Sequence, residues 1–70
     1  MRRKKVESEA LRSVGYDAKR HVLEIEFNSG EVYRYFGVPA SVHVELMDAE
    51  SHGEYFSHHV RDVFEFEHLD

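Results

Sequence analysis

An alternation of apolar and acidic residues that leads straight into a turn sequence constrains this chain more than any other feature. Residues 23–27 read Leu-Glu-Ile-Glu-Phe, a period of two that is typical of a strand with one buried and one solvated face. Residues 28–30 read Asn-Ser-Gly, and the glycine can supply the positive φ that a tight turn needs. The sequence therefore predicts a β-hairpin whose second strand starts at Glu31 and runs to about Gly37.

A further strand precedes this hairpin. Residues 10–17 alternate in the same way, although Arg12 interrupts the apolar face near one end. A turn follows at about residues 17–21, and a four-residue loop there pairs Asp17 with Val22. Because parallel neighbours need a long crossover connection, three strands joined by such short turns must be antiparallel.

The length of the loop around Gly30 decides which face of the sheet Tyr33 and Tyr35 occupy. If the loop has three residues and Gly30 is left-handed, each tyrosine lies opposite an apolar residue of the preceding strand and faces the core. A four-residue loop turns both tyrosines to the opposite face, beside the glutamates. We favour the three-residue loop, which places Arg34 and Phe36 on the face away from the core.

Two helical patterns follow the strands. Pro39 suits the first position of a helix, and Val42 and Leu46 recur at helical spacing after it. Residues 51–54 read Ser-His-Gly-Glu, a capping box that begins a second helix ending near Val60. The pattern predicts an α+β fold, in which a three-stranded antiparallel meander is packed on one face by two short helices.

The chain divides into three parts. Residues 1–9 are expected to form a disordered basic arm, residues 10–62 the folded domain, and residues 63–70 an acidic and aromatic extension. Within this extension Phe64 and Phe66 alternate with glutamates. It therefore forms either a fourth, edge strand or a tail that docks through its phenylalanines.

Positive and negative charges are unevenly distributed around a formal net charge of −5. Residues 1–5 hold four basic side chains and no acidic one, which leaves residues 6–70 with five Lys or Arg against fourteen Asp or Glu. A body with this net charge of −9 has the wrong overall sign for a polyanion such as RNA. The basic arm and isolated cations such as Arg34 and Arg61 are local exceptions.

The sequence holds no motif that specifies a reaction or a bound metal. It has no cysteine, which excludes disulfides and thiolate metal sites, and no phosphate-binding loop, nucleophile elbow or HExxH sequence. The six histidines lack the spacing of converging ligands, because neighbours such as His58 and His59 diverge on a helix. We therefore expect no enzymatic activity, no metal and no cofactor.

The distribution of apolar residues predicts the cellular location and the oligomeric state of the chain. No apolar run approaches the roughly 18 residues of a membrane span, and the basic start is not followed by the apolar region of a signal peptide. We therefore expect a cytoplasmic protein without membrane contact. Because so short a chain has a thin core, we expect a monomer or a weak homodimer.

Several segments stand in a specific order and spacing. They are Ser13–Asp17, Leu23–Phe27, Gly30, Tyr33–Tyr35, Val38–Pro39, Ser51–Phe56 and Val60–Arg61. Together they resemble the KTSC domain, a family named for the C-terminus of some lysyl-tRNA synthetases and also found as small bacterial and phage proteins. The resemblance covers about residues 10–62, and the family's hallmark Tyr-x-Tyr falls on Tyr33 and Tyr35. It implies an uncharacterised domain for which RNA binding has been suggested and to which no catalytic residues are assigned.

We predict a small non-enzymatic binding module whose ligand is RNA or the translation machinery. Tyrosines on its sheet can stack bases, and its basic arm can contact phosphates. The candidate contact residues are Tyr33, Arg34, Tyr35, Phe36, Arg61, Arg2, Arg3, Lys4 and Lys5. The alternative is a protein-interaction or accessory domain that uses its acidic surface and its aromatic C-terminal tail.

Overall fold

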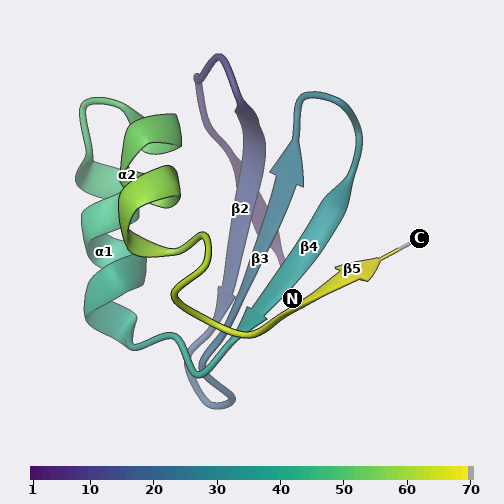
Figure 1. Ribbon diagram of the computed structural model, residues 1–70, viewed down its shortest axis with the longest axis vertical. Helices are drawn as coiled ribbons and strands as arrows, with labels where there is room; N and C mark the ends of the chain where they lie inside the picture. Colours follow the sequence, from purple (N-terminus) through teal and green to yellow (C-terminus); the bar gives the residue numbers. More distant parts are fainter. Residues whose placement is uncertain (70) are drawn as a thin grey trace.

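Five antiparallel strands form one sheet, and two helices lie on one of its faces (Figure 1). The computed structural model describes residues 1–69. In chain order its elements are β1 (Arg3–Lys5), β2 (Leu11–Asp17), β3 (Val22–Phe27), β4 (Val32–Phe36), α1 (Ala40–Asp48), α2 (His52–His59) and β5 (Phe66–Leu69). The strands lie side by side in the order β1-β2-β3-β4-β5. The α+β class and the antiparallel meander are confirmed, although the sheet has more strands than the sequence predicted.

The hairpin between β3 and β4 adopts the register that a three-residue loop requires. Tyr33 lies opposite Ile25 and Tyr35 lies opposite Leu23. The turn glycine, Gly30, has a φ of 95°, which an L side chain rarely adopts. Because directly opposed residues share a face, both tyrosines point to the side of the sheet that carries the helices.

The hairpin between β2 and β3 also has its predicted register, with Asp17 opposite Val22. The register shifts between Leu11 and Ser13, so Arg12 is an extra residue at a bulge. A bulge resets the alternation of the strand. As a result, both Leu11 and Val14 are buried although three positions separate them.

The expected disorder of residues 1–9 is wrong for Arg3–Lys5, which form strand β1 against β2. Arg3 lies opposite Gly15, and a Cβ atom at that glycine would stand only 2.9 Å from Arg3 Cγ. The missing side chain lets Arg3 cross β2 and reach Glu24, with 3.2 Å between Nη1 and Oε2. A gap in one strand and a carboxylate on the next therefore order a segment that composition alone predicts to be disordered.

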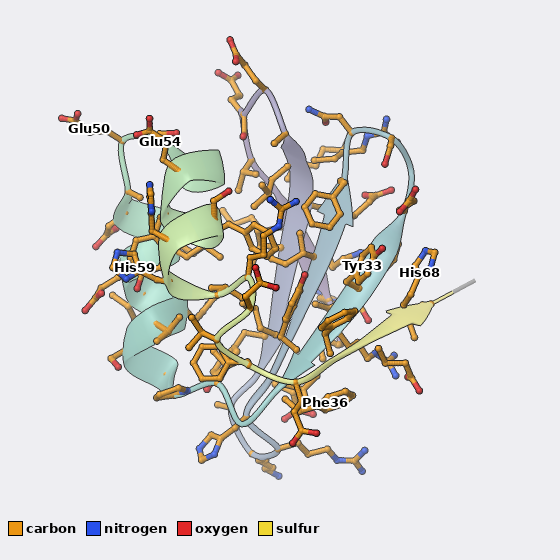
Figure 2. All side chains as sticks on the ribbon, viewed as in Figure 1. Tyr33, Phe36, Glu50, Glu54, His59 and His68 are labelled. Atoms are coloured by element: carbon orange, nitrogen blue, oxygen red, sulfur yellow. The ribbon has the colours of Figure 1, made fainter. Side chains whose placement is uncertain are left out.

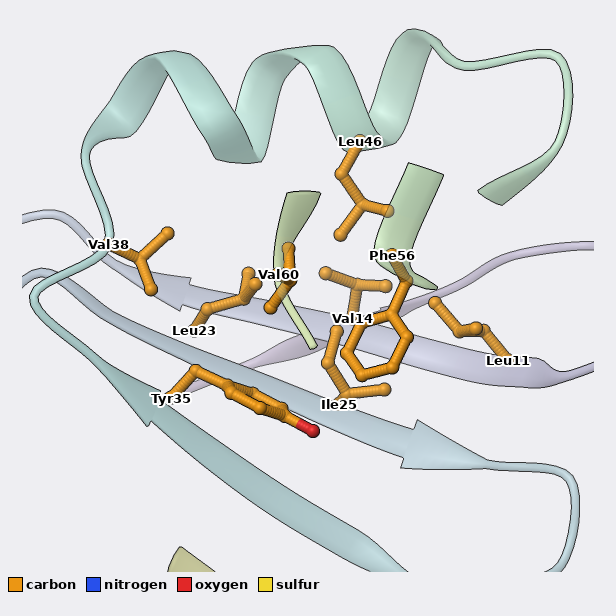
Figure 3. Close-up of a cluster of buried hydrophobic side chains, with 9 residues drawn as sticks. All are labelled: Leu11, Val14, Leu23, Ile25, Tyr35, Val38, Leu46, Phe56 and Val60. Carbon is orange, nitrogen blue, oxygen red and sulfur yellow. The ribbon is translucent and has the colours of Figure 1, made fainter. Parts of the chain in front are cut away.

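Nine buried side chains of the described residues form the core between the sheet and the helices (Figure 3). They are Leu11, Val14, Leu23, Ile25, Tyr35, Val38, Leu46, Phe56 and Val60. The predicted cap of α2 is confirmed, because the Glu54 backbone N–H donates to Ser51 Oγ at 3.2 Å. Helix α1 starts one residue later than predicted, since Pro39 keeps an extended ψ of 152° and occupies the N-cap.

The C-terminal extension forms the strand that was one of its two expected alternatives. Strand β5 pairs with β4 and lies at the edge of the sheet. Phe66 lies opposite Tyr35 and His68 lies opposite Tyr33, so all four side chains point to the helix side of the sheet. The segment that connects α2 to β5 brings Phe64 against the core.

Candidate binding cleft

A cleft of about 460 Å³ opens on the helix side of the sheet, above β4. One wall comes from α2 and the segment that follows it, a second from β4 and β5, and the rest from residues 9–10 and the turn between β3 and β4. Phe56, Arg61 and Asp62 form the first wall, and Tyr33 and Phe66 belong to the second. The cleft therefore lies where the sheet continues past the helices.

Five of the residues that line this cleft are aromatic. The rings of Tyr33 and His68 stack at 4.5 Å with 14° between their planes, and Figure 2 shows the two side chains beside each other. The Phe66 ring stands 5.7 Å from Tyr33 and is 56% exposed. Strand β5 therefore adds Phe66 and His68 beside Tyr33, and these three side chains form a solvent-accessible surface at the cleft, the aromatic ledge.

Tyr35 forms the floor of the cleft and belongs to the core as well. Its side chain is only 5% exposed, and its ring meets Phe56 edge-on at 5.4 Å. Burial raises the pKa of Tyr35 to about 12, with Tyr33 and Asp62 acting in the same direction and Arg61 against it. Tyr35 therefore keeps its proton at neutral pH and offers an uncharged hydroxyl.

The rim of the cleft carries more negative than positive charge. Glu9, Glu31 and Asp62 contribute three carboxylates, whereas Arg61 contributes one guanidinium. Arg61 is exposed, and within residues 1–69 it makes no side-chain hydrogen bond or ion pair. A cationic group at the rim is therefore favoured over an anionic one.

Glu31 is the carboxylate nearest to the aromatic ledge. The Tyr33 hydroxyl donates to Glu31 Oε2 at 3.4 Å, and His68 Nε2 lies 3.8 Å from the same oxygen. Both contacts are long, and the Glu31 side chain is 53% exposed. The carboxylate is thus free to accept a stronger donor from a ligand.

The nine residues predicted to make contacts do not form one surface. Tyr33, Tyr35 and Arg61 line the cleft, whereas Arg34 and Phe36 lie on the opposite face of the sheet, as the favoured register predicts. The Arg34 Nε–H donates to Glu24 Oε1 at 2.9 Å.

Arg3, another of the residues predicted to contact a ligand, also pairs with Glu24. Glu24 is only 7% exposed, so both arginines neutralise a nearly buried carboxylate and are less available to a ligand than their sequence positions suggest. The remaining basic candidates, Arg2, Lys4 and Lys5, are exposed along the β1 edge.

Sequence reasoning missed that Phe66 lines the cleft and that His68 stacks on Tyr33 beside it. The alternation of residues 64–68 was the available signal, since it places Phe66 and His68 on one face of a strand. Pairing with β4 was needed to show that this face is the one that carries Tyr33 and Tyr35.

Among residues 1–69 no group of three or more His, Asp or Glu is placed to hold a metal ion. Ser29, a serine at the cleft, accepts the Glu31 backbone N–H at 3.4 Å and so serves the turn. Within residues 1–69, no helix is long and apolar enough to cross a membrane.

Comparison with known proteins places this chain in a family. The model of the KTSC domain matches residues 7–64. A crystal structure of a KTSC domain protein from Yersinia pestis superposes with a TM-score of 0.96 at 33% identity, covering 99% of this chain and 97% of that one. The matched segment is slightly wider than the expected domain at residues 10–62.

Relatives include both small proteins and a much larger enzyme. An uncharacterised protein from Stutzerimonas stutzeri is 46% identical over 57 residues, which are 81% of this chain and 80% of the relative. A lysine–tRNA ligase from Nostoc punctiforme is 42% identical over 65 residues, 93% of this chain. The chain spans only 12% of that ligase. From the matched family model and these relatives, we conclude that this chain belongs to the KTSC domain family.

Proposed function

We propose that this chain is a non-enzymatic binding module of the cytoplasm, and that its ligand is a basic segment of a protein partner. An apolar side chain of this segment enters the aromatic cleft, and flanking Lys or Arg side chains contact the carboxylates at its rim. The observation that carries the proposal is an exposed aromatic ledge beside carboxylates, above all Glu31, whose contacts are long and which is largely exposed.

The aromatic ledge supports an apolar contact. Phe66 leaves more than half of its surface in water, and covering aromatic surface is the main source of affinity in small protein interfaces. Its neighbours Tyr33 and His68 are stacked against each other, so little side-chain freedom remains to be lost when a ligand binds.

The charges around the cleft favour a cationic partner over an anionic one. Three carboxylates and one guanidinium surround the cleft, and the chain beyond residue 5 carries a net charge of −9. Because phosphate neutralisation supplies most of the affinity for nucleic acids, an acidic cleft opposes them. The same field attracts a cationic peptide and speeds its association.

Chemical-shift mapping tests this proposal with defined probes. The ¹⁵N-labelled protein is titrated with acetyl-Lys-Trp-Lys-amide and, as the matched control, acetyl-Glu-Trp-Glu-amide. We expect the basic peptide to shift the amide signals of Tyr33, Arg61 and Phe66, and the acidic peptide to leave them in place. Equal responses to both peptides, or no response to either, would contradict the proposal.

A pair of tyrosine variants locates the contact. Tyr33→Ala removes an aromatic wall of the cleft, so we expect at least a tenfold loss of affinity for the basic peptide. Tyr55→Ala is the control, because Tyr55 packs on His59 and hydrogen-bonds Glu45 away from the cleft. If both variants lose affinity equally, the peptide does not bind through the aromatic cleft.

RNA is a second candidate, which the relatives and the β1 edge favour. Three of the relatives are lysine–tRNA ligases that align with 93% of this chain. The β1 edge carries Arg2, Lys4 and Lys5 in exposed positions, and the sheet tyrosines were the other predicted contact. Under this second proposal the phosphates contact the β1 edge rather than the acidic cleft.

Binding of labelled tRNA at about 50 mM and about 200 mM salt tests the RNA candidate, since phosphate contacts weaken steeply with salt. The double variant Lys4→Gln, Lys5→Gln is expected to flatten the salt dependence. Absence of binding at the lower salt concentration would rule out an electrostatic RNA mode.

A further inference from the structure

We propose that the basic partner segment binds as a sixth strand along the outer edge of β5, and that its residues alternate between basic and apolar. This inference rests on the proposed function, because it assumes a protein partner. It adds the conformation of the segment, its place on the sheet and its sequence pattern.

The backbone of β5 has hydrogen-bonding groups that point away from the sheet. The Phe36 backbone N–H donates to the Glu65 carbonyl at 2.9 Å, and these two residues come next in line after the last pair of the β4–β5 register, Tyr35 opposite Phe66. Hydrogen-bonded and non-hydrogen-bonded pairs alternate along an antiparallel ladder. The backbone N–H and C=O groups of Phe66 and His68 therefore face outward, where among the described strands no neighbour follows β5.

The two faces of β5 differ in chemistry. Phe66 and His68 point to the side of the cleft, as their pairing with β4 requires. Glu65 and Glu67 point to the other face, and both are exposed. A strand added to this edge places alternate residues beside the aromatic ledge and beside the two glutamates. Apolar residues suit the first set, and lysines or arginines suit the second.

The opposite edge of the sheet is unsuited to the same segment. Strand β1 consists of Arg3, Lys4 and Lys5, all exposed. Lysines on an edge strand discourage pairing with another strand, and here they also repel a basic one. The charge difference between the two edges therefore directs a basic segment to β5.

Hydrogen exchange tests the strand addition directly. The probe is acetyl-Lys-Val-Lys-Val-Lys-Val-Lys-amide, and the control replaces each lysine by glutamate. We expect the basic peptide to slow exchange of the Phe66 and His68 amides at least tenfold, with no slowing in β1. If the basic peptide shifts cleft signals but leaves these two amides exchanging freely, strand addition is wrong and the cleft proposal stands. If it produces neither effect, both fail.

Two N-methylated peptides test whether backbone pairing holds the segment. In an antiparallel addition the valine amides face β5, because opposed residues share a face and exchange both hydrogen bonds. Methylating the valine amides should then reduce affinity at least tenfold, whereas methylating the lysine amides should not. The reverse result means parallel addition, which also supports a sixth strand. Equal losses would overturn it.

Charge reversal at β5 provides a third measurement. Glu67→Lys places a like charge opposite the peptide's lysines and should weaken binding about fivefold, the upper range for a cross-strand charge pair. Glu50→Lys is the matched control, because Glu50 is also exposed and lies by the helices, on the far side of the molecule from β5 (Figure 2). Equal effects of the two variants would overturn the proposed location.

A nucleic acid or a second copy of this chain at the outer edge of β5 would each give a distinct result in the same measurement. Poly-U added in place of the peptide tests a nucleic acid, and a concentration series of the protein alone tests a second copy. Slowed exchange of the Phe66 and His68 amides with poly-U, or with rising protein concentration, would overturn the assignment to a basic peptide segment.

Discussion

Replacing Gly15 by alanine should release strand β1 from the sheet. The added Cβ atom would stand 2.9 Å from Arg3 Cγ and 3.0 Å from the Arg2 carbonyl oxygen. The arginine side chain can move, but the carbonyl belongs to the backbone of the N-terminal segment. A contact this short forces β1 to shift or to leave.

The loss of stability equals the free-energy cost of whichever response is smaller, a shift of β1 or its detachment. Overpacking that stays in place costs about 1–3 kcal/mol. Detachment costs less, because β1 has three exposed residues and Glu24 keeps Arg34 as its partner when Arg3 leaves. The lost pair is partly solvated at Arg3 and contributes at most about 1 kcal/mol. The reduced freedom of the unfolded chain offsets about 0.4–1 kcal/mol. We expect a net loss below about 1 kcal/mol, or a fall in Tm of less than about 8 °C, so amide exchange in the N-terminal segment is the more sensitive readout.

Thermal unfolding and amide exchange together check this prediction. The Val6 backbone N–H donates to the Arg12 carbonyl at 3.1 Å, so its exchange rate reports whether the N-terminal segment is docked. Gly53→Ala is the control, because its Cβ would meet only ordinary contacts at 3.5 Å or more. Since Gly53 lies in a helix, that change should stabilise the protein by about 0.5–1 kcal/mol. A Gly15→Ala protein with unchanged Tm and unchanged Val6 exchange would refute the reasoning.

Three further changes have defined outcomes. Phe56→Ala removes a ring that is 3% exposed and should lower the free energy of unfolding by about 3–5 kcal/mol, measured by urea titration, with Phe56→Leu as the milder control. Ser51→Ala removes the acceptor of the Glu54 N–H and should cost about 1 kcal/mol; a Ser57→Ala control on the exposed side of α2 should change little. Because burial raises the pKa of Tyr35 from 10.0 to about 12, its stabilisation is complete below pH 10 and is lost as the pH rises towards 12. The Tyr35→Phe variant should therefore lose less stability than the wild type over this window, and a parallel decline would contradict the assignment.

Local rules were sufficient for the two hairpins. The alternation of residues 23–27 predicted the buried face of β3, and the conformational freedom of Gly30 favoured the three-residue loop that decides where Tyr33 and Tyr35 point. Both signals lie within a few residues of the structure they determine. The cap at Ser51 is equally local, and it was predicted for the same reason.

Strand β1 and the cleft could not be predicted in this way. The order of β1 depends on a gap at Gly15 and a carboxylate at Glu24, which are far from Arg3 in sequence. The cleft depends on how far α2 extends over the sheet and on β5 pairing with β4. Such features arise from packing between distant segments, for which the sequence pattern contains no direct signal.

The docked N-terminal segment has a practical consequence for anyone who trims this protein. The region matched by the family model begins at residue 7, after β1 has already ended. A chain shortened to that boundary would expose the outer amides of β2, and Glu24 would keep Arg34 as its partner but lose Arg3. An uncovered strand of this kind is a template for aggregation. Truncated versions should therefore precipitate more readily than the full chain, even though they retain every residue of the shared domain.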